Sequence, residues 1–292
     1  MKTGIYDNIE INDYHALRDY YNSTRIKLAK KSLNTLKSHD ENWKDEGRKQ
    51  HYDTGNAFEV MLTDKENIEN RIAITNEEDW RNEALKDNPK LSEPSRSKVY
   101  RELKDKFYGD NESKYIITPP IQDDCLEMLK SCYSDELIRS LVKESDSQKS
   151  ILWNCANTGL KLKTRPDLIH HKSKTVIDIK TAEDGSPEKF SKACVNLDYP
   201  LQASLQIKGV LESGLLDEVK NYFWLVVEKN SPYNATLYRF TKDDQEMVAD
   251  SLDYYIGQIN EAVNSGIWGG YNQRADNKLG ILDLELPLYY RR

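Results

Sequence analysis

Cysteine and long apolar runs are scarce in this 292-residue sequence. Its four cysteines, Cys125, Cys132, Cys155 and Cys194, form no C-x-x-C pair. That spacing excludes the usual zinc and iron–sulfur sites and predicts free thiols in a reducing compartment. No apolar stretch approaches the ~20 residues that cross a membrane. The first seven residues also lack the apolar core of a signal peptide. We therefore expect a cytoplasmic protein with no membrane partner.

The charge is unevenly distributed. The formal net charge of −7 argues against a protein that coats DNA. Residues 161–180 nevertheless hold six lysine or arginine residues against two aspartates. An acidic exterior with one basic strip favours an enzyme that admits nucleic acid to a single groove, although such a strip can also be a plain solvated face.

The two aspartates of that strip are spaced to face each other. A turn centred between Lys172 and Ser173 places Asp167 opposite Asp178 in a β-hairpin, with Lys180 on the same face as Asp178. Facing carboxylates repel, and a divalent cation between them turns that cost into affinity. The pattern predicts a metal site beside a lysine, which is the arrangement of a phosphodiester-cleaving centre. The alternative is a solvated edge hairpin with mixed charge.

The periodicity predicts one α/β domain over residues 1–292, with a helical N-terminal elaboration at about 1–120, a catalytic core at about 121–272 and a tail at 273–292. The helices are expected at 13–38, 56–62, 78–86, 95–107, 121–132, 135–144, 188–195, 200–213 and 242–265. The strands are expected at 150–153, in a hairpin at 159–181, and at 221–229 and 235–240.

Three short segments carry a resemblance to a known family. They are Leu162–Asp167, Val176–Thr181 and Tyr199–Gln202, and together they resemble the nuclease domain of exodeoxyribonuclease VIII, the RecE-type enzyme. That group belongs to the PD-(D/E)XK superfamily, which also contains phage lambda exonuclease. Gly55–Glu59, Trp224–Tyr233 and Trp268–Tyr271 add to the likeness, which is sharp over about 148–272. It implies a central mixed β-sheet flanked by helices.

The resemblance also implies roles for individual residues. One or two Mg²⁺ or Mn²⁺ ions would be held by Glu59, Asp167, Asp178 and the backbone carbonyl of Ile179. The catalytic residues would be Asp167, Asp178, Lys180 and Gln202. The DNA-binding residues would be Arg165, which is expected across the hairpin from Lys180, together with Lys163 and Tyr199.

Two positions depart from the family pattern. Glu59 stands where family members usually carry histidine; a glutamate oxygen is a good ligand for Mg²⁺, but Glu59 could also lie on the wet side of its helix. His51 could substitute for the missing histidine. Gln206 stands where the family tends to carry tyrosine, which puts a base-stacking role there in doubt. His170 and His171 are expected at an exposed turn.

The resemblance implies a Mg²⁺-dependent exonuclease that degrades one strand from the 5′ end of duplex DNA. The 3′ single-stranded tail would pass to a strand-annealing partner in recombination, and the enzyme would form a ring-like trimer or tetramer in the cytoplasm of a bacterial host. Two alternatives stay open: a structure-specific or restriction-like endonuclease, and a non-catalytic DNA-binding subunit with the same fold.

Overall fold

The computed structural model describes residues 1–7, 9–43, 53–274 and 280–286. Its strands span Gly4–Tyr6 (β1), Ile72–Ile74 (β2), Tyr115–Ile117 (β3), Asp146–Ser147 (β4), Ser150–Asn154 (β5), Lys161–Thr164 (β6), Leu168–His170 (β7), Thr175–Ala182 (β8), Asn221–Glu228 (β9) and Ala235–Arg239 (β10). Within the described ranges they form a five-stranded sheet ordered β10-β9-β8-β7-β4, a three-stranded sheet β1-β5-β6 and a two-stranded sheet β2-β3.

The helices are shorter and more numerous at the N-terminus than the sequence predicts. They span Ile11–Ala16 (α1), Ser23–Lys31 (α2), Leu33–Glu41 (α3), Asp53–Thr63 (α4), Ile68–Arg71 (α5), Glu77–Asp87 (α6), Lys98–Asp110 (α7), Pro119–Ser134 (α8), Glu136–Lys143 (α9), Pro187–Asn196 (α10), Tyr199–Glu212 (α11) and Lys242–Ser265 (α12). The single helix expected at 13–38 divides because Asn22 and Ser32 are helix caps: each side chain accepts a hydrogen bond from the backbone three residues later.

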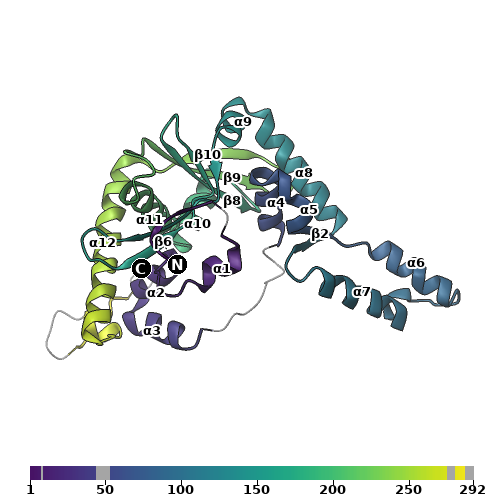
Figure 1. Ribbon diagram of the computed structural model, residues 1–292, viewed down its shortest axis with the longest axis horizontal. Helices are drawn as coiled ribbons and strands as arrows, with labels where there is room; N and C mark the ends of the chain where they lie inside the picture. The colour runs from purple at the N-terminus through teal and green to yellow at the C-terminus, as the bar shows by residue number, and fades with distance from the viewer. Residues whose placement is uncertain (8, 44–52, 275–279, 287–292) are drawn as a thin grey trace.

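The five-stranded sheet is mixed, as expected. Strand β8 pairs in parallel with β9 and antiparallel with β7. Successive residues of β8 enter different cores, because side chains alternate along a strand. Val176 packs with α2, α11 and α12, whereas Ile177 packs with α4, α8 and α9. Figure 1 shows these two helical layers on either side of β8 and β9.

The hairpin expected at 159–181 is shorter than predicted. Strand β6 pairs with β5 in the three-stranded sheet, so the hairpin consists of β7 and β8 alone. Pro166 lies between β6 and β7 and has no N–H to donate to a ladder, so the chain changes sheets there. The predicted register is confirmed, since Leu168 pairs with Ile177 and His170 with Thr175. Asp167 therefore lies at the bend just before β7.

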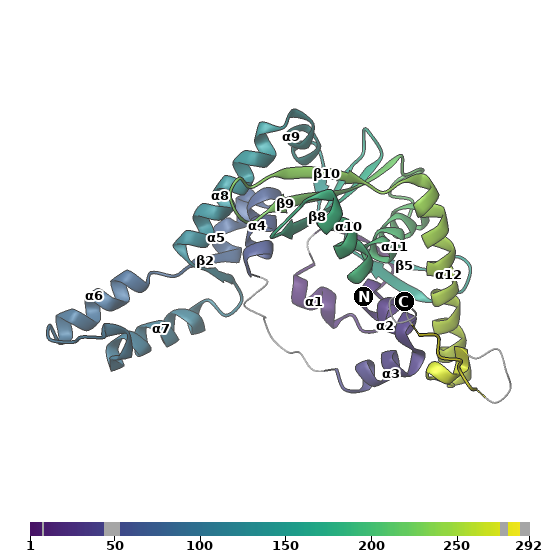
Figure 2. The ribbon, with the colours of Figure 1, turned by 180° about the vertical axis from the view of Figure 1, so that it is seen from behind.

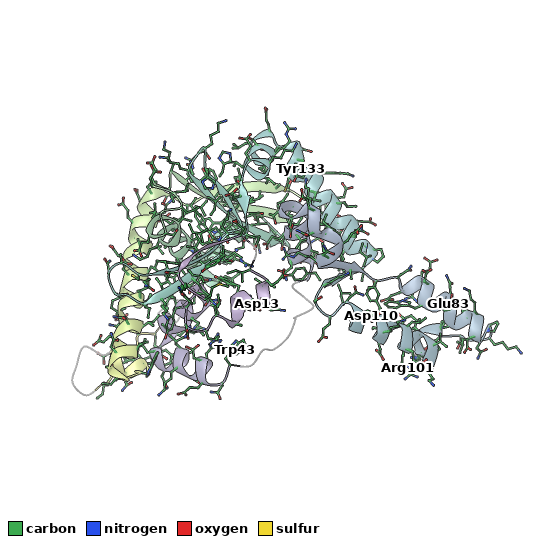
Figure 3. All side chains as sticks on the ribbon, viewed as in Figure 1. Asp13, Trp43, Glu83, Arg101, Asp110 and Tyr133 are labelled. Atoms are coloured by element: carbon green, nitrogen blue, oxygen red, sulfur yellow. The ribbon has the colours of Figure 1, made fainter. Side chains whose placement is uncertain are left out.

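Helices α6 and α7 form an arm that projects from the body (Figures 1 and 2). The arm has its own small core, in which the ring centroids of Trp80 and Tyr100 lie 5.8 Å apart. Strands β2 and β3 connect it to the body. Glu83, Arg101 and Asp110 lie on this arm, far from the sheet (Figure 3). The helical elaboration expected at 1–120 thus also contains three short strands, and its α2 belongs to the main core.

Helix α12, strand β9 and the cysteines agree with the sequence predictions. Helix α12 has the predicted bounds, and β9 is an interior strand of the sheet. All four cysteines are free, and three of them are buried. None of the helices in the described residues is long and apolar enough to span a membrane.

Candidate active site

Asp178 lies at the centre of the candidate site. It occupies the middle of β8 with 1% of its surface exposed, and its side chain points toward α11. Its Oδ1 accepts hydrogen bonds from Nε2 of Gln202 at 2.9 Å and from Nε2 of Gln206 at 3.2 Å. Its Oδ2 forms an ion pair with Nζ of Lys180, two residues along the same face of the strand. A buried carboxylate with these partners is held in one orientation.

Asp167 is fixed beside Asp178 by the backbone of β8. Its Oδ2 accepts the N–H of Ile179 at 2.6 Å. One step along from the Leu168–Ile177 pair, the register brings Asp167 opposite Asp178, which is the predicted juxtaposition. Asp167 is only half-buried, because the bend at Pro166 ends the strand at this point.

Glu59 enters the site from α4, on the other side of the sheet. This helix lies close to β8 because Gly55 has no side chain: a Cβ there would lie 3.0 Å from Oγ1 of Thr181. Glu59 is half-buried, and its Oε1 accepts a hydrogen bond from Nε2 of Gln148. Gln148 has a positive φ of 55° in the tight turn between β4 and β5. The turn thus holds an amide against the carboxylate.

The carboxylates of the site disturb one another. Burial raises the pKa of Glu59, and the charge of Asp178 adds to the rise. Burial also raises the pKa of Asp167 well above its ordinary value, and the charges of Glu59 and Asp178 add to it. Burial alone would lower the pKa of Lys180, but the charges of Asp178 and Asp167 outweigh it and raise that pKa, so Lys180 stays protonated. Glu59 and Asp167, crowded beside Asp178 and a single lysine, therefore favour their neutral forms unless a cation compensates their charge.

The donor set suits a hard divalent cation. Carboxylate and carbonyl oxygens are the ligands that Mg²⁺ and Mn²⁺ prefer. Oδ2 of Asp178 is buried and, among the described residues, lacks a hydrogen bond of good geometry; it is held by the ion pair with Lys180. Among the described residues, no three side chains of His, Cys, Asp or Glu lie close enough together to hold one ion as they stand. The residues fit a metal by chemistry, and each acid faces a donor of the protein itself.

Two residues expected to bind DNA face the N-terminal segment instead. Lys163 is 2% exposed, and its Nζ donates to the carbonyls of Tyr14 at 2.6 Å and Leu17 at 3.0 Å. Burial, together with the charges of nearby arginines, lowers the pKa of Lys163 to about 7. The expectation that Lys163 contacts DNA is therefore corrected: its Nζ holds the end of α1.

Arg165 also lies elsewhere than predicted. It is not across a strand pair from Lys180, because the β7–β8 ladder ends at Leu168. Its guanidinium donates to Oγ of Ser150 at 2.7 Å and to the carbonyl of Ile9. These bonds occupy donors that a phosphate clamp would need.

Tyr199 does border the site. It is the first residue of α11, and its ring centroid lies 4.8 Å from Nζ of Lys180. Its contact with DNA stays a prediction. His51 lies outside the described residues. His170 is 5% exposed rather than solvated, and its Nδ1 pairs with Oγ of Ser173. Gln206 is 2% exposed, so it offers no surface for base stacking.

Sequence reasoning missed a second lysine at the site. Lys27 on α2 donates to the carbonyl of Leu197 at 2.7 Å. Burial and then the charge of Lys180 lower the pKa of Lys27 to about 8. The two lysines are far apart along the chain, and no spacing signal connects them. The contact of Gln206 with Asp178, in contrast, follows from its position one helical turn after Gln202.

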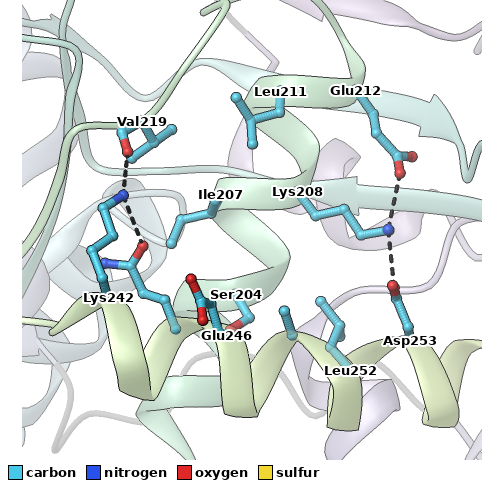
Figure 4. Close-up of a pocket in the computed structure, with 12 residues that line it drawn as sticks. Ser204, Ile207, Lys208, Leu211, Glu212, Val219, Lys242, Glu246, Leu252 and Asp253 are labelled. Carbon is cyan, nitrogen blue, oxygen red and sulfur yellow. Dashed lines mark hydrogen bonds and ion pairs between the residues drawn. The ribbon is translucent and has the colours of Figure 1, made fainter.

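A pocket of about 390 Å³ lies between α11 and α12 (Figure 4). Lys208 spans its edge and pairs with Glu212 and Asp253, both at 2.9 Å. The α11 residues that line it, including Ser204 and Lys208, lie on the opposite side of the helix from Gln202 and Gln206. The pocket is therefore separate from the carboxylate site.

Comparison with known proteins identifies the fold. Among solved structures, one described as "Putative exonuclease" from Eubacterium rectale is similar with a TM-score of 0.54 and 13% identity, covering 96% of each chain. At that identity the likeness shows the fold alone. A second, SSO0001, has a TM-score of 0.29 at 15% identity over 73% of this chain and 88% of that one, which carries no argument. No curated protein matches.

The family comparison covers most of the sequence. The model of a PDDEXK-like domain of unknown function, DUF3799, matches residues 22–277. This range includes Glu59, Asp167, Asp178, Lys180 and Gln202. The match agrees with the mixed sheet and its two helical layers. The chain belongs to this family of PDDEXK-like domains.

Proposed function

We propose that this protein is a divalent-metal-dependent DNA exonuclease that hydrolyses phosphodiester bonds from the 5′ ends of duplex DNA. The observation that carries the proposal is the meeting of two acids and a lysine at one end of the β7–β8 ladder. Asp178 is buried and paired with Lys180, and Asp167 is anchored to the backbone beside them. Placing charged groups in an otherwise apolar sheet is costly, and such clusters are typical of catalytic sites.

Each residue of the site has its own role in the proposed reaction. Glu59, Asp167, Asp178 and the carbonyl of Ile179 would hold one or two Mg²⁺ or Mn²⁺ ions. The chemistry that such an ion supplies is polarisation of the phosphate and activation of water. Lys180 stays protonated, so its ammonium can offset charge on the phosphate but cannot accept a proton. Gln202 orients Asp178 through its hydrogen bond to Oδ1.

Two features support a nucleic-acid backbone as the substrate. The solved structure of similar fold is described as "Putative exonuclease" and is covered over nearly its full length. Within the site, burial lowers the pKa of Lys27 and the charge of Lys180 lowers it further, so the two ammonium groups repel. A backbone phosphate near both would relieve that repulsion. Tyr199 lies beside Lys180 and is proposed to contact the DNA there.

The test uses duplex DNA labelled at either the 5′ or the 3′ end, together with covalently closed circles. With Mg²⁺ we expect early release of the 5′ label as mononucleotides, a persisting 3′-labelled strand, and intact circles. Chelation of the metal should stop the reaction. Cutting of closed circles at a similar rate would instead indicate an endonuclease.

Matched variants connect this activity to the site. Asp167→Asn and Asp178→Asn should each abolish cleavage, while Asp217→Asn, at a position 77% exposed and paired with Lys174, should not. If the protein bound DNA but neither cut it nor bound Mn²⁺, the non-catalytic DNA-binding alternative would replace the proposal.

The assembly is also a proposal. A closed ring of three or four copies would retain DNA by topology, which would explain how a chain of net charge −7 stays on its substrate. The 3′ tails would then pass to a single-strand annealing protein. Light scattering coupled to gel filtration measures the number of copies, and a monomer at micromolar concentration would contradict the ring.

A further inference from the structure

We propose that Tyr222 and Gln206 form a hydrogen-bonded relay that positions the carboxylate of Asp178 for metal binding. The hydroxyl of Tyr222 donates to Oε1 of Gln206 at 2.6 Å, and Nε2 of Gln206 donates to Oδ1 of Asp178 at 3.2 Å. This inference rests on the proposed function, because it concerns how the nuclease holds one of its metal ligands. Neither residue contacts the reacting atoms, so both are positioning residues.

The direction of each hydrogen bond follows from the carboxylate. An ionised carboxylate only accepts, so the amide of Gln206 must present its NH₂ group to Asp178. Its carbonyl then points toward Tyr222, whose hydroxyl has to donate. Burial raises the pKa of Tyr222 well above its ordinary value, and the charge of Asp178 adds to the rise, so the hydroxyl keeps its proton. The amide is therefore locked at both ends.

The positions of these residues come from two different elements. Tyr222 is on β9, next to β8, and pairs with Val176, two residues before Asp178. Gln206 is one turn after Gln202 on α11, so both amides face the same carboxylate oxygen. Two amides on Oδ1 leave Oδ2 as the oxygen that faces Lys180 and the rest of the site.

The burial of Gln206 and Tyr222 supports a positioning role for both residues. Gln206 is 2% exposed and Tyr222 is fully buried. A buried amide or hydroxyl is costly unless it is hydrogen-bonded, and an apolar side chain of similar shape would fill the same core without that requirement. Groups that orient a ligand are known to change metal affinity by about 10- to 100-fold when they are removed.

The experiment measures Mn²⁺ binding to the metal-free full-length protein by isothermal titration calorimetry, independently of cleavage. Gln206→Met keeps the shape of the side chain and removes both hydrogen bonds, whereas Tyr222→Phe removes one hydroxyl. We expect Gln206→Met to weaken Mn²⁺ binding by about 10-fold or more, and Tyr222→Phe by a smaller factor. The double variant should bind like Gln206→Met alone, because Tyr222 acts through Gln206.

A control variant and the Asp178→Asn variant separate failure of the relay from failure of the metal site. Tyr238→Phe also removes a tyrosine hydroxyl bond, to the carbonyl of Gly185 at 2.6 Å, and should leave Mn²⁺ affinity unchanged. If the effects of Gln206→Met and Tyr222→Phe are absent or simply add, the relay is wrong. If the relay fails in this way but Asp178→Asn still abolishes Mn²⁺ binding, the proposed metal site remains valid. If the wild type binds no Mn²⁺, or Asp178→Asn binds it equally well, the proposed function fails and the relay fails with it.

Discussion

Gly209 allows α11, the helix that carries Gln202 and Gln206, to lie close to β5 and β6 of the three-stranded sheet. A Cβ at this position would lie 2.8 Å from Cγ2 of Thr164 and 2.8 Å from Cη2 of Trp153. Both distances are shorter than real side chains tolerate. Alanine at position 209 must therefore push α11 away from β5 and β6 or distort their side chains.

The size of this effect can be worked out against a matched position. Replacing glycine by alanine inside a helix gains ~1 kcal/mol of helix propensity. Overpacking a core costs ~1–3 kcal/mol. Gly257 on α12 has open space where a Cβ would lie, with nothing within 4 Å, so Gly257→Ala receives only the gain. We expect Gly257→Ala to stabilise the protein and Gly209→Ala to be less stable than it by roughly 1–3 kcal/mol.

Urea unfolding followed by circular dichroism measures both variants under identical conditions. The free energies of unfolding should differ in the stated direction, with similar denaturant slopes. Equal stabilisation by the two substitutions would refute the close packing of α11 on β5 and β6.

Three further outcomes are expected. Mn²⁺ at about 100 times its dissociation constant should stabilise the fold by ~2.7 kcal/mol in thermal unfolding, and Asp178→Asn should abolish that gain; an equal gain in the variant would contradict the site. Burial lowers the pKa of Lys163 from 10.5 to about 7 in the folded state. Between these two pH values the folded state binds fewer protons than the unfolded state, so the contribution of Lys163 to the free energy of unfolding rises with pH. Lys163→Met should lack this rise in urea unfolding from pH 7 to 10, and an identical pH profile would show that Lys163 does not titrate there. Lys180→Gln should slow DNA cleavage by about 10²-fold or more, whereas Lys172→Gln, 85% exposed at the turn, should not; comparable rates for the two variants would exclude the electrostatic role.

Local patterns predicted the parts of this fold that depend on local physics. The register of β7 with β8 follows from the turn between them, and the apolar run of β9 indicates a strand covered on both faces. The bounds of α12 follow from its cap at Thr241 and its end at Gly266. Each of these signals lies within a few residues of the element it specifies.

The remaining features depend on contacts between distant segments. The basic residues Lys163 and Arg165 resemble a DNA-binding strip in sequence, but they hold the N-terminal segment, which is about 150 residues away along the chain. The short strand β1 exists only because it pairs with β5. Gln148 meets Glu59 across 89 residues, and no periodicity indicates that meeting. Alternation and spacing carry no information on such pairs.

Anomalous scattering from crystals grown with Mn²⁺ tests the central claim most directly. The account predicts a manganese peak bonded to carboxylate oxygens of both Asp167 and Asp178, with Glu59 turned toward it. A well-occupied peak elsewhere, with Asp178 still paired only to Lys180, would contradict it.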